Sequence, residues 1–198
     1  MNTIKSIEAL ETLYGAPVER SLTKVKTHVT PLYREWIKAS RFMVLSTVGP
    51  EGTDASPRGD DGPVVQISDT KTLLLPDWKG NNRLDSLRNI VRDDRVSCMF
   101  MVPGSLNVVR VNGTAVLTDD DALRDRFEKK GKRPATVVVI TVRELYFQCA
   151  KAIMRSDLWN APHSDVPSAG QFVREVDQDF DAETYDATYP DYAKPRMW

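Results

Sequence analysis

The chain has 198 residues, of which 41% are hydrophobic and 28% are charged, with a formal net charge of -1. The length and composition are those of an ordinary folded protein, so we expect one domain with terminal extensions. A protein that binds the phosphate backbone of nucleic acids needs an excess of basic residues. The net charge of this chain excludes such an excess. No apolar run approaches the ~18 residues of a membrane span, and charged residues occur early in the chain, so neither membrane insertion nor export is expected.

The two cysteines, Cys98 and Cys149, each lie inside an apolar run, without a CxxC motif or a neighbouring histidine. This pattern indicates neither a disulfide framework nor a zinc site, and no metal site is predicted. It fits the reducing cytoplasm, which is the predicted location of the protein. We expect Cys149 to be buried and unreactive, because buried cysteines are usually inert.

Residues 1–41 are predicted to form a helical extension. Apolar residues recur at helical spacing after an N-cap at Asn2 or Thr3, and Gly15 and Pro17 end this first pattern. Further helical turns follow, with Pro31 suited to the first turn of a helix. The apolar positions are Ile4, Ile7, Leu10, Leu13, Leu22, Val25, Leu32, Trp36 and Ile37.

Residues 42–159 are predicted to form a barrel domain. Short apolar runs follow one another here, separated by Gly, Pro, Asn and Asp turns, with few helices between them. This pattern predicts a mainly β fold with flanking helices (α+β), in which an antiparallel sheet closes on itself as a barrel. The predicted strands are residues 42–48, 64–67, 73–75, 96–102, 108–111, 114–117 and 135–142.

Two helices are predicted to interrupt these strands. One covers about residues 82–91, with Leu84, Leu87 and Val91 as its apolar stripe. The other covers about residues 120–130, after a cluster of aspartates that caps it and before a glycine that ends it.

Residues 160–198 are predicted to form an acidic arm that contains four prolines. The arm holds eight Asp or Glu and three Lys or Arg, and it cannot build a core alone. Its aromatic residues indicate that it packs on the barrel or on the partner in a dimer.

The segment from Pro76 to Arg88 combines a strand end, a Gly-Asn-Asn turn and a helix start. Free amides at a helix N-terminus and the nearby Arg83 suit an anion such as a phosphate. The alternative is a capped helix in which Asn81 or Asn82 satisfies its own backbone and Arg83 is solvated. This segment alone favours that alternative.

Arg58 lies between a proline and a glycine, on or just after a strand, and two aspartates follow it. In an antiparallel meander its guanidinium and that of Arg83 would converge on one phosphate through forked hydrogen bonds. The alternative is a tight turn in which Arg58 pairs with Asp60 or Asp61.

A third cluster, Lys151, Arg155, Ser156 and Trp159, follows the strongest β-branched run. Its cations and flat ring suit a planar anionic ligand. The alternative, which this segment alone slightly favours, is a strand that leads into a turn, with Trp159 as core filling.

Four ordered motifs between Phe42 and Trp159 resemble the pyridoxamine 5'-phosphate oxidase-related FMN-binding proteins. The resemblance is closest to a bacterial branch of FMN-dependent enzymes and not to the vitamin B6 oxidase itself. The motifs are Ser56-Pro-Arg-Gly-Asp60; Leu75-Pro-Asp77 with Gly80-Asn-Asn-Arg83 and Asn89-Ile90; Val102-Pro-Gly104 with Arg110-Val-Asn-Gly113; and Cys149-Ala-Lys-Ala152 with Arg155-Ser156 and Leu158-Trp159.

This resemblance implies a split β-barrel homodimer that holds two FMN molecules at the subunit interface. In one subunit, Arg58 and the pair Asn82-Arg83 would bind the FMN phosphate, and the strand around Pro76 and Asp77 would run along the flavin. The partner would supply Lys151, Arg155 and Trp159. The residues that the resemblance implies for cofactor binding are Ser56, Arg58, Pro76, Asp77, Asn82, Arg83, Lys151, Arg155 and Trp159.

The implied function is an FMN-dependent oxidoreductase that acts on an unidentified small molecule, with NADH or NADPH as electron donor. No acid-base pair is evident, and flavin hydride transfer does not require one. The acidic arm lacks the basic residues with which the vitamin B6 oxidase holds its substrate phosphate, so the resemblance does not extend to that substrate.

Two alternatives stay open. One is a flavin-binding or stress-response protein without turnover, and the other is the same barrel with haem or a deazaflavin as its ligand. The chain has two histidines, His28 and His163, which argues against haem because a histidine often supplies an axial ligand.

Overall fold

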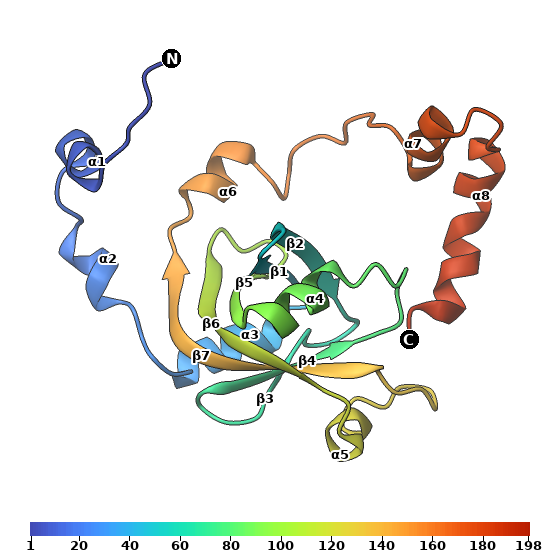
Figure 1. Cartoon of the computed structure of the whole chain (residues 1–198), viewed down its shortest axis with the longest axis horizontal. Helices are drawn as coiled ribbons and strands as arrows, with labels where there is room; N and C mark the ends of the chain where they lie inside the picture. Colours follow the sequence, from blue (N-terminus) through green and yellow to red (C-terminus); the bar gives the residue numbers. More distant parts are fainter.

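A computed structural model describes residues 1–198. An antiparallel sheet curls into an open barrel at its centre, and helical segments lie on opposite sides of the barrel (Figure 1). The strands are β1 (Phe42–Gly49), β2 (Gly52–Gly59), β3 (Gln66–Ile67), β4 (Thr72–Asp77), β5 (Arg95–Met101), β6 (Val108–Thr118) and β7 (Thr136–Gln148). The helices are α1 (Ile7–Tyr14), α2 (Glu19–Thr23), α3 (Pro31–Ala39), α4 (Asp85–Arg92), α5 (Asp121–Asp125), α6 (Lys151–Ser156), α7 (Ala169–Val176), α8 (Ala182–Ala193) and the 3-10 helix η1 (Lys194–Arg196).

The sheet has seven strands in the order β2-β1-β5-β6-β7-β4-β3, with every neighbouring pair antiparallel. Its end strands, β2 and β3, share no ladder, so the prediction of a closed barrel is wrong and the split, α+β form is confirmed. The physical reason is that β3 has two residues, which is too short to continue a ladder, and the connection from Gly59 to Gln66 contains Pro63.

One hydrophobic core fills the barrel. Strand β1 buries alternate residues, Met43, Leu45 and Thr47, because successive side chains of a strand point to opposite faces. β5 repeats this pattern with Val96, Cys98 and Phe100. Ile37 of α3 is fully buried in the same core, so α3 closes one side of the barrel.

The two strands predicted at residues 108–111 and 114–117 are one strand, β6, with a bulge between Asn112 and Gly113. Gly113 lies so close to β7 that an added Cβ would stand 2.0 Å from the Thr141 carbonyl oxygen. The bulge kinks the strand and lets one long ladder bend around the core, which is why the sequence pattern appeared interrupted.

Helix α4 begins later than predicted and buries a different face. Leu84 and Val91 are 45% and 74% exposed, whereas Ser86, Asn89 and Ile90 are buried. The predicted apolar stripe is therefore wrong for Leu84 and Val91, and only its third residue, Leu87, packs against the core. The physical reason is that the barrel offers hydrogen-bond partners on this side. The Asn89 amide donates to Thr47 Oγ1 at 3.1 Å, and the Ser86 hydroxyl donates to the Asp54 carboxylate.

The other local predictions were partly right. Pro31 opens α3 and Gly15 ends α1 with a φ of 73°, as predicted, but the N-cap of α1 is Ser6. Helix α5 is shorter than predicted and begins after its N-cap Asp120. Cys149 is exposed, so the expectation that it is buried is wrong, because it follows the end of β7 instead of lying inside the strand.

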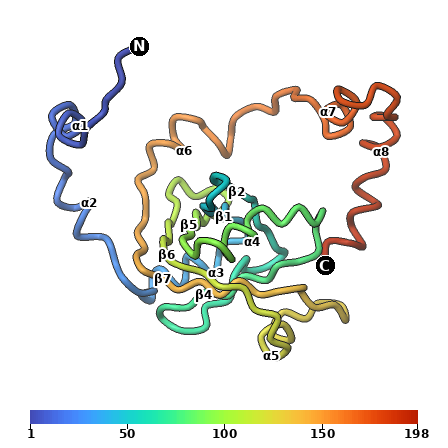
Figure 2. Tube along the Cα trace, in the orientation of Figure 1, coloured from blue at the N-terminus to red at the C-terminus, as the bar shows by residue number.

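The terminal segments lie away from the barrel over most of their length. α1 and α2 bury no residue, and α7 and α8 form a hairpin on the opposite side (Figure 1). The Cα trace shows the chain after α8 turning back, so that the C-terminus lies beside the barrel (Figure 2). None of the helices is both long and apolar enough to cross a membrane.

Candidate functional site

Arg58 and Asp77 form an ion pair across the split in the barrel. Arg58 lies opposite Met43 on the inward face of β2, and its Nη1 donates to Asp77 Oδ1 at 2.5 Å. Asp77 is the last residue of β4, on the other side of the split. The alternative pairing of Arg58 with Asp60 or Asp61 is wrong, because both of those carboxylates bind Lys129.

The Arg58 guanidinium keeps donors for a ligand. Its bond to Asp77 uses Nη1 alone, and its Nε is buried without a hydrogen-bond partner. The indole Nε1 of the nearby Trp78 is likewise buried and unpaired. Buried donors are rarely left without an acceptor, so two of them beside one cavity point to a ligand that carries acceptor oxygens.

A cavity of about 170 Å³ lies at this point of the barrel. Ligand pockets for whole small molecules usually measure about 300–1,000 Å³, so this cavity suits one end of a larger ligand. The residues that line it are Pro57, Arg58, Gly59, Asp60, Val64, Leu75, Pro76, Trp78 and Met197.

Three of the residues predicted for the cofactor come together here. Arg58 and Pro76 line the cavity, and Asp77 holds Arg58 in place. Ser56 is half-buried and lies on the same face of β2, two residues before Arg58. We find Ser56 beside this cluster but not among the residues that line the cavity.

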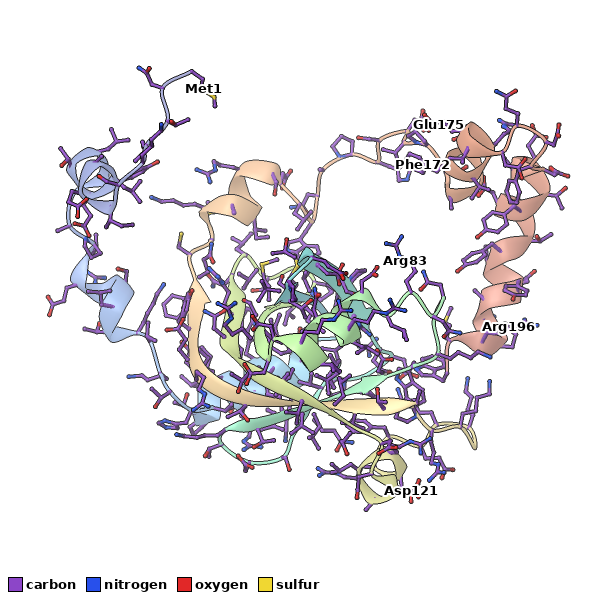
Figure 3. All side chains as sticks on the ribbon, viewed as in Figure 1. Met1, Arg83, Asp121, Phe172, Glu175 and Arg196 are labelled. Atoms are coloured by element: carbon purple, nitrogen blue, oxygen red, sulfur yellow. The ribbon has the colours of Figure 1, made fainter.

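Asn82 and Arg83 lie in the loop before α4, where Asn82 and Leu84 have left-handed φ angles of 61° and 63°. The Arg83 side chain is 76% exposed, pairs with Asp85 at 2.9 Å, and projects outward from the loop (Figure 3). Its backbone N–H donates to Asn81 Oδ1 at 3.1 Å, as the alternative for this segment described. Arg83 is not among the residues that line the Arg58 cavity, and convergence of the two guanidiniums on one phosphate stays a prediction.

The third predicted cluster is separate from the cavity in this chain. Lys151 and Arg155 are exposed on α6 and make no ion pair with any residue of the chain. The Trp159 indole donates to the Ser105 carbonyl oxygen at 2.7 Å, which fixes the ring against the loop between β5 and β6. None of these three side chains bonds to Arg58 or Asp77.

Three residues of the cavity, Val64, Trp78 and Met197, lie outside the motifs that the sequence analysis quoted. Trp78 follows Asp77 directly, so its position next to a predicted site residue was a usable signal. Met197 had no such signal, because it lies 38 residues beyond Trp159, the nearest predicted site residue, and reaches the cavity through the fold of the C-terminal arm.

A second and larger hollow, of about 850 Å³, lies on the outer face of the sheet. Paired residues from five neighbouring strands, β2 through β7 in sheet order, form a row across it. Within this row Ser97 donates to Asn112 Oδ1 at 2.6 Å, and Asn112 donates to Glu144 Oε1 at 2.7 Å. The row residues are Ala55, Ser46, Ser97, Asn112 and Glu144. Of these, the sequence analysis placed only Asn112 in a motif, and it predicted none of them as a cofactor residue.

Among solved structures, the chain is similar to a HupZ variant from Group A Streptococcus, with 19% identity and a TM-score of 0.50, over 61% of this chain and 99% of that one. It is similar to General Stress Protein 26 from Bacillus anthracis, with 16% identity and a TM-score of 0.42, over 57% and 88% of the two chains. It is also similar to an FMN-binding protein from Syntrophomonas wolfei, with 11% identity and a TM-score of 0.46, over 71% and 95% of the two chains. The search of curated proteins found no match.

The family comparison covers the part of the chain that builds the barrel. The family model described as pyridoxamine 5'-phosphate oxidase matches residues 29–149, which is more than half of the chain. The match includes β1 to β7 with Arg58, Asp77 and Arg83. It spans the first three motifs, whereas the fourth lies beyond it except for Cys149. The chain therefore belongs to the pyridoxamine 5'-phosphate oxidase family.

Proposed function

We propose that this protein binds FMN, with the FMN phosphate at the Arg58 cavity, and that it is an oxidoreductase acting on a small molecule. The observation that carries the proposal is the buried, unpaired Nε of Arg58 beside a cavity that suits one end of a ligand. A phosphate supplies acceptor oxygens and negative charge, and a guanidinium binds it through two parallel N–H donors.

The size of the cavity supports binding of the phosphate end alone. A cavity of about 170 Å³ is smaller than the usual pocket for a whole cofactor, so the isoalloxazine ring would lie outside it. Asn82 and Arg83, in the exposed loop before α4, would then reach the phosphate or the ribityl chain by a side-chain movement, since no packing holds Arg83 where it is.

A second copy of the chain would cover the exposed ring. Lys151 and Arg155 are exposed cations without an acidic partner in their own chain, and Trp159 is a flat ring fixed nearby on the loop between β5 and β6. Cations and aromatic rings are the groups that suit a planar anionic ligand. The homodimer is therefore part of the proposal, with each cofactor held by residues of both copies.

FMN would supply the hydride or electron transfer, and the protein would supply binding and electrostatics. Arg58 would neutralise phosphate charge, and Lys151 or Arg155 beside the ring would favour the reduced, negatively charged flavin. Pro76 would shape the cavity wall, and Asp77 would keep the Arg58 guanidinium oriented for the phosphate.

Visible absorption of the purified protein tests the proposal. We expect a flavin spectrum, or its appearance after addition of FMN, with loss of absorbance when NADH or NADPH is added without oxygen. Riboflavin, which lacks the phosphate, is the matched control ligand. Two charged hydrogen bonds at about 1.5–3 kcal/mol each predict that riboflavin binds at least about 100-fold more weakly than FMN.

The outcomes separate the competing functions. A protein that takes up no FMN contradicts the proposal, and equal affinity for riboflavin and FMN contradicts the phosphate site. A bound flavin that no nicotinamide reduces contradicts NADH and NADPH as donors and favours the flavin-binding protein without turnover. Haem finds no support in the cavity, because neither His28 nor His163 lines it.

A further inference from the structure

The chain's last residues lie on the Arg58 cavity. After the α7–α8 hairpin, which stands away from the barrel, η1 brings the chain back to it (Figures 1 and 2). Met197 is the one residue of this arm that lines the cavity, and it lies there with Arg58, Pro76 and Trp78. The arm therefore contacts the barrel at the point where the proposed phosphate site opens.

Three lysines between α5 and β7 hold this segment. Lys132 Nζ donates to the Pro195 carbonyl oxygen at 2.9 Å. Two ammonium groups lie close to the Trp198 ring, with Lys129 Nζ 5.1 Å and Lys130 Nζ 5.0 Å from the ring centroid. These are cation–π distances, so each lysine contributes a separate attraction to the segment.

Lys129 links this contact to the strand that carries Arg58. Its ammonium also binds the carboxylates of Asp60 and Asp61, which follow β2 directly. Asp60 itself lines the cavity. One ammonium therefore joins the aromatic residue of the arm to the rim of the cavity.

Met197 is a poor partner for the groups that it covers. Its thioether is at most a weak acceptor, and Arg58, which lines the same cavity, has a buried Nε without a hydrogen bond. The side chain is 52% exposed, so it covers the rim and does not fill the cavity. A phosphate would satisfy donors that the arm leaves unpaired, which gives the anion a differential affinity for the uncovered state.

We propose that Pro195–Trp198 is a cover for the Arg58 cavity, held on the Lys129–Lys132 turn, which leaves when a phosphate group enters. This inference rests on the proposed function, because it takes the FMN phosphate as the entering group. The cover slows entry of the ligand and keeps the empty site closed to other anions.

The rate of FMN association tests the cover. In Trp198→Ala the ring contacts to both lysines are lost, so we expect the bimolecular rate constant, measured by stopped-flow quenching of flavin fluorescence, to rise at least fivefold. The matched control is Val176→Ala, which changes an apolar residue of the same arm that is 90% exposed, and which leaves the rate unchanged. An unchanged or lower rate in Trp198→Ala overturns the proposal.

A second measurement follows the segment itself. Heteronuclear NOE values of the tryptophan indole N–H groups report rigidity, and Trp159, whose indole is hydrogen-bonded, is the internal reference. Without FMN we expect Trp198 to be as rigid as Trp159, and mobile in Lys132→Ala. With FMN bound to the unaltered protein we expect it to become mobile. A Trp198 that stays rigid with FMN bound overturns the proposal.

The two measurements distinguish failure of the cover from failure of the proposed function. FMN that binds with unchanged kinetics in Trp198→Ala removes the cover and keeps the FMN site. If FMN binds neither the unaltered protein nor Trp198→Ala, both the proposed function and the cover are wrong. The NOE values without ligand still show whether the segment is docked on the barrel. FMN that binds only Trp198→Ala confirms that the segment blocks the site.

Discussion

Arg58 and Asp77 meet at 2.5 Å across the split in the barrel, joining β2 to β4, which share no backbone ladder. The two side chains are only 20% and 12% exposed. An anion that binds the remaining donors of Arg58 therefore acts on the same guanidinium that ties the two sides of the barrel together. Ligand binding and the integrity of the split are coupled through one side chain.

Replacing Asp77 with Ala leaves a mostly buried guanidinium without its partner. Breaking a fully buried pair typically costs about 3–5 kcal/mol, and the partial exposure of this pair reduces our expectation to about 2 kcal/mol of unfolding free energy. Urea denaturation measures the change. The double variant Arg58→Ala with Asp77→Ala should lose less than the sum of the single variants, and strict additivity would show that the pair contributes nothing.

The two arginines of the proposed phosphate site should contribute unequally to FMN affinity. Arg58→Ala removes a preorganised donor pair beside the cavity, at about 1.5–3 kcal/mol, whereas Arg83 is exposed and must first leave Asp85. Titration by flavin fluorescence measures both. Arg92→Ala, on the outer face of α4, is the control and should leave affinity unchanged. A larger loss in Arg83→Ala than in Arg58→Ala would contradict the assignment.

Gly113→Ala should be strongly destabilising. The new Cβ would stand 2.0 Å from a backbone oxygen of β7, which cannot move without breaking the ladder, so overpacking should cost about 2 kcal/mol or more. Gly80→Ala is the matched control, since nothing lies within 4 Å of its Cβ position. Thermal unfolding compares the melting temperatures of the two variants. Equal melting temperatures would show that the backbone at the bulge shifts to accommodate the added Cβ at little cost.

The two thiols should differ in reactivity. Burial raises the pKa of Cys98 to about 12, so at neutral pH it is a protonated thiol out of contact with solvent, whereas Cys149 is exposed. The native protein should react with one equivalent of a thiol reagent, and the denatured protein with two. Cys149→Ser should abolish the native reaction, and labelling that persists in this variant would mean that the core opens at Cys98.

The lowered pKa of Asp93 predicts that the protein loses part of its unfolding free energy in acid. Hydrogen bonds from Arg95 lower its pKa from the ordinary value of 3.8 to about 2. A depressed folded-state pKa stabilises the fold above the unfolded value, and this contribution is lost as the pH falls from about 4 to about 2. The stability difference between the unaltered protein and Asp93→Asn should therefore shrink over this range in urea titrations. A difference that grows towards low pH would contradict the assignment.

The order of strands and turns was largely predictable from sequence, and two of the exceptions, β2 and the buried face of α4, share one physical cause. β2 is built from small and polar residues around Pro57 and lies at the sheet edge, where it packs against polar groups of α4, so it lacks the apolar alternation by which strands are recognised. The face of α4 was mispredicted for the same reason. Ser86 and Asn89 are buried because Asp54 and Thr47 receive their hydrogen bonds, and helical periodicity contains no such information.

The residues of the candidate site likewise include some that the sequence predicted and some that it did not. Arg58, Pro76 and Asp77 were predictable, because short motifs mark residues held by local turns and strand ends. The contribution of Met197 depends on the path of the whole arm, and a sequence of ordinary residues does not encode that path in any short pattern. Asn82, Arg83, Lys151, Arg155 and Trp159 remain predicted cofactor residues that the binding experiments test.

The open barrel leaves two strand edges, and neither offers a template for further pairing. Pro57 on β2 has no N–H to donate, charged residues flank it on the same strand, and β3 presents two residues only. Exposed edges of long, apolar strands recruit other chains into aggregates, and this chain has none at either end of its sheet. Copies of the chain at high concentration are thus protected from aggregation by edge-strand pairing. Their association has to proceed through side-chain packing.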